Sequence, residues 1–226
     1  LIRCDMKYRS FCYIYYLGNN INKIIMGVTC VYPWPLASGK NGQQVVDVLQ
    51  KNVELAGAVW SDGWCVDCET YQSVASVGSP PKILHIVHNT EYPLSTFACL
   101  ENGSCLVADR GFDNVMLKIK GCYEPRKGAK IEAKGQRYEL GDFVIKIGQV
   151  TVGVSFKGIL IEVEYLPCLV ASQCWSLMQE FLEGITGIAV TMPSSPNKKS
   201  DSKFKPSDTI MQYLEQFNKW KKVSTT

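Results

Sequence analysis

Apolar side chains recur at every second position in two stretches of the chain, 143–147 and 159–163. Successive side chains of a strand point to opposite sides of a sheet, so this period is typical of strands with one buried face. Three glycines interrupt these stretches where an antiparallel chain must turn or bulge: Gly148, Gly153 and Gly158. We therefore expect residues 141–182 to form three strand-like runs followed by a helix.

Three other stretches have the apolar spacing of amphipathic helices. The first covers 38–57 and stops at Gly57, the second covers 172–185 with Ser172 as its N-cap, and the third covers 208–222. Each of these helices needs a surface to cover. The sequence therefore predicts helices packed against a sheet.

Shorter strand-like runs fill most of the remaining chain. They cover 27–32, 64–71, 83–88, 94–100 and 105–108. Asn102 and Gly103 predict a type I′ turn between the last two runs, whereas 112–120 fits either a strand or a helix. The order is a strand, a helix, about eight antiparallel strands and a helix. It predicts an α+β fold in which an antiparallel β-barrel-like sheet has flanking helices.

Two segments differ in character from the rest. Residues 1–25 have no clean helical or strand period, and we expect them to be an N-terminal extension that is disordered or artefactual. We expect a single domain to cover 26–222. A signal peptide is the alternative for 1–25, but the Asn-rich end of this segment has no small-residue cleavage site. Residues 184–207 carry prolines, serines and lysines, which predicts a flexible linker within that domain.

Charge and hydropathy argue against two classes of partner. The net charge is +3, but four basic residues and one acidic residue lie in 1–25, which leaves 20 of each sign from Met26 onward. A neutral body lacks the positive face that direct nucleic-acid binding needs. No apolar run reaches the about 18 residues of a membrane span.

The chain has 10 cysteines, a number that could suggest a disulfide framework. Most of them lie inside apolar strand-like runs or on a helix, where a thiol behaves as a small buried apolar group. We therefore predict reduced cysteines.

Two pairs of metal-ligand residues resemble a zinc site in their spacing: Cys65 with Cys68, and His85 with His88. Residues three apart on a strand point to opposite faces, so neither pair can share a metal on an unbroken strand. The interpretation that fits is two adjacent strands without metal or cofactor.

Glu162 and Glu164 project from one face of one strand. A barrel could use two such carboxylates to hold a divalent cation against a triphosphate, with Lys118 and Lys120 as phosphate contacts. The alternative is that the glutamates belong to the solvated face of a half-buried sheet. Few basic residues accompany the pair, and no phosphate loop or nucleophile motif is present. We therefore predict no catalytic residue.

Tyr213, Phe217 and Trp220 form an aromatic stripe on the predicted C-terminal helix. The stripe could contact a partner protein. Alternatively it covers the domain to which it belongs, as such stripes more often do. Both possibilities remain open from the sequence, and we take the stripe as a candidate partner interface.

Several segments taken together resemble the Mediator subunit 20 family. They are Met26–Val31, Cys65–Tyr71, His88–Leu94, Glu101–Gly103, Ile161–Tyr165, Val170–Leu177 and Asp208–Lys219. The resemblance covers about Met26 to Lys222 in order, and it is lost in 1–25 and around 184–205.

The resemblance implies a non-enzymatic nuclear protein of the Mediator coactivator complex, with a barrel-like antiparallel sheet. It implies pairing with subunit 18 in the head module, attachment through the C-terminal part of subunit 8, and a role in conveying regulatory signals to RNA polymerase II. The barrel is also similar to that of RNA triphosphatases. A metal-dependent triphosphate-tunnel hydrolase that uses Glu162 and Glu164 is therefore the alternative function.

Overall fold

The computed structural model describes residues 27–36, 41–77, 80–126, 130–190 and 202–223. The predicted extension 1–25 lies outside them. No helix in the described ranges has the length and apolar character needed to cross a membrane.

Nine strands form one sheet, and all of the strand pairs in it are antiparallel. Their order is β1-β9-β8-β7-β2-β3-β4-β5, and β6 pairs with β2 beside this path. The strands are β1 (Val28–Trp34), β2 (Val59–Ser73), β3 (Ile83–Asn89), β4 (Ser95–Leu100), β5 (Cys105–Asp109), β6 (Tyr123–Pro125), β7 (Ile131–Leu140), β8 (Phe143–Val152) and β9 (Ser155–Tyr165). The predicted α+β class is confirmed, but β1 and β5, the two edge strands of the described sheet, do not pair with each other. The sheet is open, so the barrel description fits only loosely.

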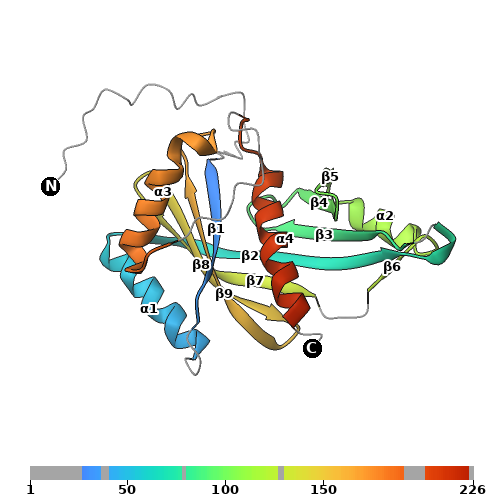
Figure 1. The fold of residues 1–226 in the computed structure, drawn as a ribbon, viewed down its shortest axis with the longest axis horizontal. Coiled ribbons are helices and arrows are strands. Elements are labelled where there is room, and N and C mark those ends of the chain that lie inside the picture. Colours follow the sequence, from blue (N-terminus) through green and yellow to red (C-terminus); the bar gives the residue numbers. More distant parts are fainter. Residues whose placement is uncertain (1–26, 37–40, 78–79, 127–129, 191–201, 224–226) are drawn as a thin grey trace.

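The helices are α1 (Gly42–Leu55), α2 (Phe112–Lys118), α3 (Ala171–Thr186) and α4 (Pro206–Val223), with a short 3-10 helix η1 (Ala75–Val77). Helices α1, α3 and α4 cover the two faces of the central strands, whereas α2 packs on β3 and β4 (Figure 1). Ile161 and Val163 pack with α1 and α3 on one face, whereas Leu160 packs with α4 on the other. The predicted half-buried strands are therefore buried on both faces. The ambiguous segment 112–120 is helical at α2.

Two helix ends differ from the predicted ones. The side chain of Asn41 caps α1 by accepting the backbone N–H of Gln43 at 2.9 Å. The residue before α3 is Val170, so the predicted N-cap Ser172 is the second residue of the helix. Helix α3 ends where Gly187 takes the left-handed conformation with φ of 71°, which a glycine adopts without steric cost.

The turn between β4 and β5 is not the predicted two-residue type I′ turn. Four residues, 101–104, separate the two strands, and the N–H of Gly103 donates to the carbonyl of Leu100 at 3.0 Å. Gly103 has φ of 86°. Gly103 is therefore the fourth residue of the turn. In this position the glycine alone takes a positive φ, whereas a type I′ turn needs a positive φ at both central residues.

The predicted linker 184–207 is ordered at both of its described ends. Helix α3 continues to Thr186, Val190 and Phe204 are buried in the core under α1 and α3, and α4 begins at Pro206. Residues 191–201 lie outside the described ranges.

Helix α4 lies across the opening of the sheet. It contacts β1 at one end of the strand order and β4 and β5 at the other (Figure 1). The buried side-chain amide of Gln212 accepts the N–H of Val31 and donates to the carbonyl of Thr29, both at 2.8 Å. Gln212 thus bonds to β1 as a neighbouring strand would, and so α4 protects that edge.

We expect Gln212→Leu to lower the free energy of unfolding by about 1–3 kcal/mol, because it leaves buried backbone groups of Val31 and Thr29 without partners. The measurement is urea unfolding followed by circular dichroism. Glu215→Leu, a similar change at an exposed site of the same helix, should stay within about 0.5 kcal/mol of the parent. Equal losses in the two variants would contradict the role of Gln212.

Candidate functional site

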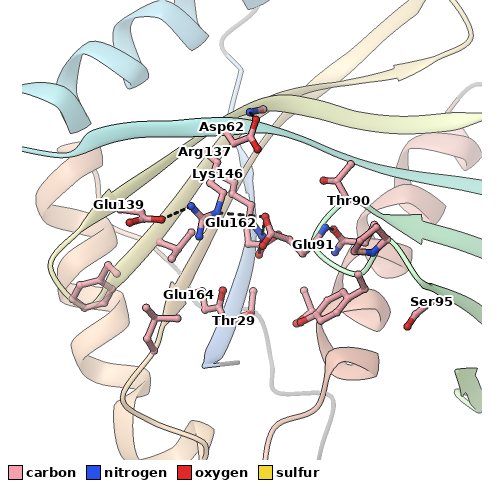
Figure 2. Close-up of a pocket in the computed structure, with 18 of the residues that line it drawn as sticks. Thr29, Asp62, Thr90, Glu91, Ser95, Arg137, Glu139, Lys146, Glu162 and Glu164 are labelled. Atoms are coloured by element: carbon pink, nitrogen blue, oxygen red, sulfur yellow. Dashed lines mark hydrogen bonds and ion pairs between the residues drawn. The ribbon is translucent and has the colours of Figure 1, made fainter. Parts of the chain in front are cut away.

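A polar pocket of about 650 Å³ opens where β7, β8 and β9 meet the β3–β4 connection. Figure 2 shows its charged side chains, which include both predicted glutamates, Glu162 and Glu164, on β9. The predicted sharing of one strand face by the two carboxylates is thus observed. Lys118 and Lys120, considered as phosphate contacts, do not line the pocket.

Glu162 forms a buried ion pair with Lys146. The β8–β9 register places these residues opposite each other, and Nζ lies 2.8 Å from Oε1. Each residue is only 2% exposed. The hydroxyl of Tyr213, on α4, donates to the other carboxylate oxygen of Glu162. Glu162 therefore holds three elements together and is not part of a solvated face.

The electrostatics of this group favour the charged form of Lys146. Burial alone would lower the pKa of Lys146, but the carboxylates of Glu162 and Glu91 raise it above its ordinary value. Burial raises the pKa of the Tyr213 hydroxyl well above its usual range, and Glu162 adds to that shift. Tyr213 is thus a neutral donor beside a paired carboxylate.

Glu164 has a separate structural partner. Its Oε1 accepts the backbone N–H of Gly27 at 2.7 Å, just before β1. Burial is the largest cause that raises the pKa of Glu164, and the Gly27 hydrogen bond and Lys146 oppose it. Its role is to fix the start of β1, so the two glutamates do not act as one pair.

The pocket has the wrong charge for a triphosphate. Its lining includes five carboxylates, Asp62, Glu91, Glu139, Glu162 and Glu164, against two cations, Arg137 and Lys146. Both cations are already engaged: Arg137 lies 2.5 Å from Glu139 and 3.4 Å from Glu91, and Lys146 is held by Glu162. An acidic lining repels phosphate groups. Within the described ranges no cluster of three or more metal-ligating side chains could hold a cation against them.

The cysteine and histidine pairs lie as strand alternation predicts. The Sγ of Cys68 is 3.9 Å from Nδ1 of His85 on the face under α4. His88 lies on the opposite face, where its two ring nitrogens are each 3.2 Å from a carboxylate oxygen, of Asp67 and of Asp113. Strand geometry therefore separates the two histidines.

The two histidines should affect stability in opposite directions as pH changes. The hydrogen bond to Asp67 raises the pKa of His88, and burial lowers that of His85 to about 4. A pKa that is raised on folding stabilises the folded state fully below the pKa of the unfolded chain, about 6.5. This stabilisation is lost as the pH rises through the pKa of the folded chain. His88→Gln should therefore cost more stability at about pH 6 than at about pH 8.

His85→Gln is the matched control. Below the pKa of His85 in the unfolded chain, unfolding lets this side chain take up a proton, which favours the unfolded state. The variant removes this effect, so its loss in free energy of unfolding should be smaller at about pH 6 than at about pH 8. Urea unfolding of both variants and the parent at the two pH values measures the trends. The same trend in both variants would show that the assignment is wrong.

The aromatic stripe of α4 packs inside this chain. Tyr213 and Phe217 are 0% exposed and belong to the core between α4 and the sheet. Trp220 is half-buried on the same core, with its ring against Gly158. Tyr213 and Phe217 thus fill this chain's own core, whereas Trp220 is only partly buried, and the stripe as a partner interface stays a prediction.

The residues that organise the pocket besides Glu162 and Glu164 are Lys146, Arg137 and Glu91, which the sequence analysis did not select. A lysine on one strand and a glutamate on the next are a usable signal for a cross-strand pair. That signal requires the register, which only the structure supplies.

Comparison with known proteins identifies the family. The family model described as "TATA-binding related factor (TRF) of subunit 20 of Mediator complex" matches residues 26–218. The chain is 48% identical over 202 residues to Mediator of RNA polymerase II transcription subunit 20 of Mus musculus, covering 87% of this chain and 95% of the mouse protein. The Xenopus laevis protein of the same name is 48% identical over 206 residues, covering 89% and 98%.

Similarity to solved structures is much weaker. PH1012 protein from Pyrococcus horikoshii OT3 gives a TM-score of 0.43 at 10% sequence identity, covering 78% of this chain and 94% of that one. The sequence match is the finding that carries the assignment: this chain belongs to the family of subunit 20 of the Mediator complex.

Proposed function

We propose that this chain is a non-catalytic, nuclear subunit of the Mediator head module that helps couple transcription regulators to RNA polymerase II. It forms a heterodimer with subunit 18 and is joined to the module through the C-terminal part of subunit 8. The observation that carries the proposal is its agreement with subunit 20 proteins over 95–98% of their length.

The surface supports a role in protein contacts. Large apolar side chains are exposed on β5 and on α2. Both elements lie at the same end of the fold as β3 and β4 (Figure 1). The side chains are Leu106 and Val107 on the edge strand β5, and Val115 and Leu117 on α2. Exposed apolar groups of this kind suit a subunit that is covered in an assembly.

Association with subunit 18 is the direct test. The chain from Met26 onward, co-expressed with subunit 18, should co-purify as a stoichiometric dimer that stays together in gel filtration at micromolar concentration. Separate elution of the two chains would contradict the heterodimer. The same experiment with the C-terminal part of subunit 8 added should give a three-chain complex.

Catalysis is tested separately. With Mg²⁺ or Mn²⁺ present, we expect the parent chain to release no more phosphate from a nucleoside triphosphate than the Glu164→Gln variant does. The reason is that the pocket cations are already paired with carboxylates. Glu164→Gln is preferred to a change at Glu162, whose carboxylate is needed by Lys146 and Tyr213. Release that needs the metal and is lost in the variant would favour the hydrolase.

A further inference from the structure

Two thiols face each other across the hairpin of β4 and β5. Cys99 pairs directly with Cys105 in the antiparallel register, and their sulfur atoms are 3.1 Å apart. They are two of eight free cysteines in the described ranges. Neither the pocket nor the Mediator assignment uses them.

The backbone at this pair is compatible with a disulfide. The N–H of Leu100 donates to the carbonyl of Ser104 at 2.9 Å, next to the cysteine pair. This pattern makes Cys99 and Cys105 a non-hydrogen-bonded pair, the kind in which opposite residues of an antiparallel ladder lie closer. Their expected Cβ separation of about 4.5 Å approaches that of a disulfide, so the sulfurs can bond after a small side-chain movement.

The two thiols differ in access and in acidity. Cys99 is fully buried, whereas Cys105 is half-buried. The Cys99 thiol donates to Cys105, and this hydrogen bond lowers the pKa of Cys105 and raises that of Cys99. Cys105 is therefore the better nucleophile, and Cys99 is placed to react second.

We propose that Cys99 and Cys105 form a reversible thiol-oxidation site that takes hydrogen peroxide and closes a disulfide across the hairpin. The Cys105 thiolate attacks one peroxide oxygen, giving a sulfenic acid and, with a proton, one water. The Cys99 sulfur then displaces the sulfenic hydroxyl, forming the S–S bond, and the thiol proton leaves with the hydroxyl as a second water. Two thiols are oxidised and one peroxide is reduced.

The other described cysteines lack this arrangement. Cys65 and Cys68 are three apart on β2, on opposite faces. Cys168 and Cys174 are also hydrogen-bonded to each other, but they lie before and within α3 and not opposite each other across a hairpin. Cys122 is exposed and serves as a matched lone thiol.

The test uses the folded chain treated with a small excess of hydrogen peroxide. After blocking of thiols and unfolding, a protease that cleaves after glutamate and aspartate cuts at Glu101, between the two cysteines, and at Asp109, which separates Cys105 from Cys122. The fragments 92–101 and 102–109 stay joined only by a Cys99–Cys105 disulfide, which mass spectrometry detects and dithiothreitol reverses. We expect this linkage to form at least about tenfold faster than Cys122 oxidises, because the second thiol is already positioned.

Two variants define the order of reaction. Cys99→Ala should leave Cys105 as a sulfenic acid that dimedone labels, and Cys105→Ala should abolish both linkage and label at this hairpin. Linkage that forms equally fast in urea, or oxidation of Cys122 at the same rate as the pair, would overturn the proposal. Strong dimedone labelling of Cys99 in Cys105→Ala would overturn the assigned roles.

Discussion

Lys146→Met is expected to lower the free energy of unfolding by about 3–5 kcal/mol, since it leaves a buried carboxylate without its counter-ion. Nζ of Lys146 is 2.8 Å from Glu162, and Glu162 is only 2% exposed. The Tyr213 hydroxyl that remains is a single neutral donor and does not compensate a full charge. Urea unfolding of the variant and the parent at neutral pH measures the loss.

Two further variants separate charge from packing. Lys134→Met makes the same change at an exposed site on β7 and should stay within about 0.5 kcal/mol of the parent. The double variant Lys146→Met with Glu162→Gln removes the orphaned charge and keeps an acceptor for Tyr213. It should recover about 1–2 kcal/mol of the loss. A double variant no more stable than Lys146→Met would mean that lost packing, not the buried charge, causes the effect.

The strands around this pair were predictable, but their register was not. Period-two alternation located β8 and β9 closely, because each strand needs apolar side chains on its core face. The register depends on an irregularity between the Thr151–Phe156 and Val150–Gly158 pairs, where β9 has one extra residue. Without that bulge Ile161, not Glu162, would face Lys146. No local pattern in the sequence specifies such an insertion.

The solvated-face interpretation of Glu162 was wrong for a related reason. Alternation shows that a strand has one apolar face, but it does not show what covers the other face. Here α4, more than 40 residues further along the chain, covers that face and supplies Tyr213. The helix itself was predictable from its spacing, whereas its docking site depends on long-range packing. For the same reason the sequence could not show whether the aromatic stripe of α4 packs in the core or contacts a partner protein.

Phe217→Ala should also lower the free energy of unfolding by about 3–5 kcal/mol, the usual cost of removing a fully buried aromatic ring. Phe217 is 0% exposed, with its ring centroid 5.8 Å from that of Tyr213 in the core under α4. Loss of the ring leaves a cavity beneath the helix that crosses the opening of the sheet. Heat and urea unfolding of the isolated chain measure the change.

The same variant decides between core and interface for the α4 stripe. Lys219→Ala, an exposed position one half-turn further on, should stay within about 0.5 kcal/mol of the parent. Because Phe217 supports the sheet from inside, its loss should destabilise the isolated chain. Any weakening of association with subunit 18 should then follow from that loss and disappear when the fold is stabilised by lower temperature. A Phe217→Ala chain of unchanged stability that no longer binds its partner would instead place the stripe at the interface and require α4 to leave the sheet on assembly.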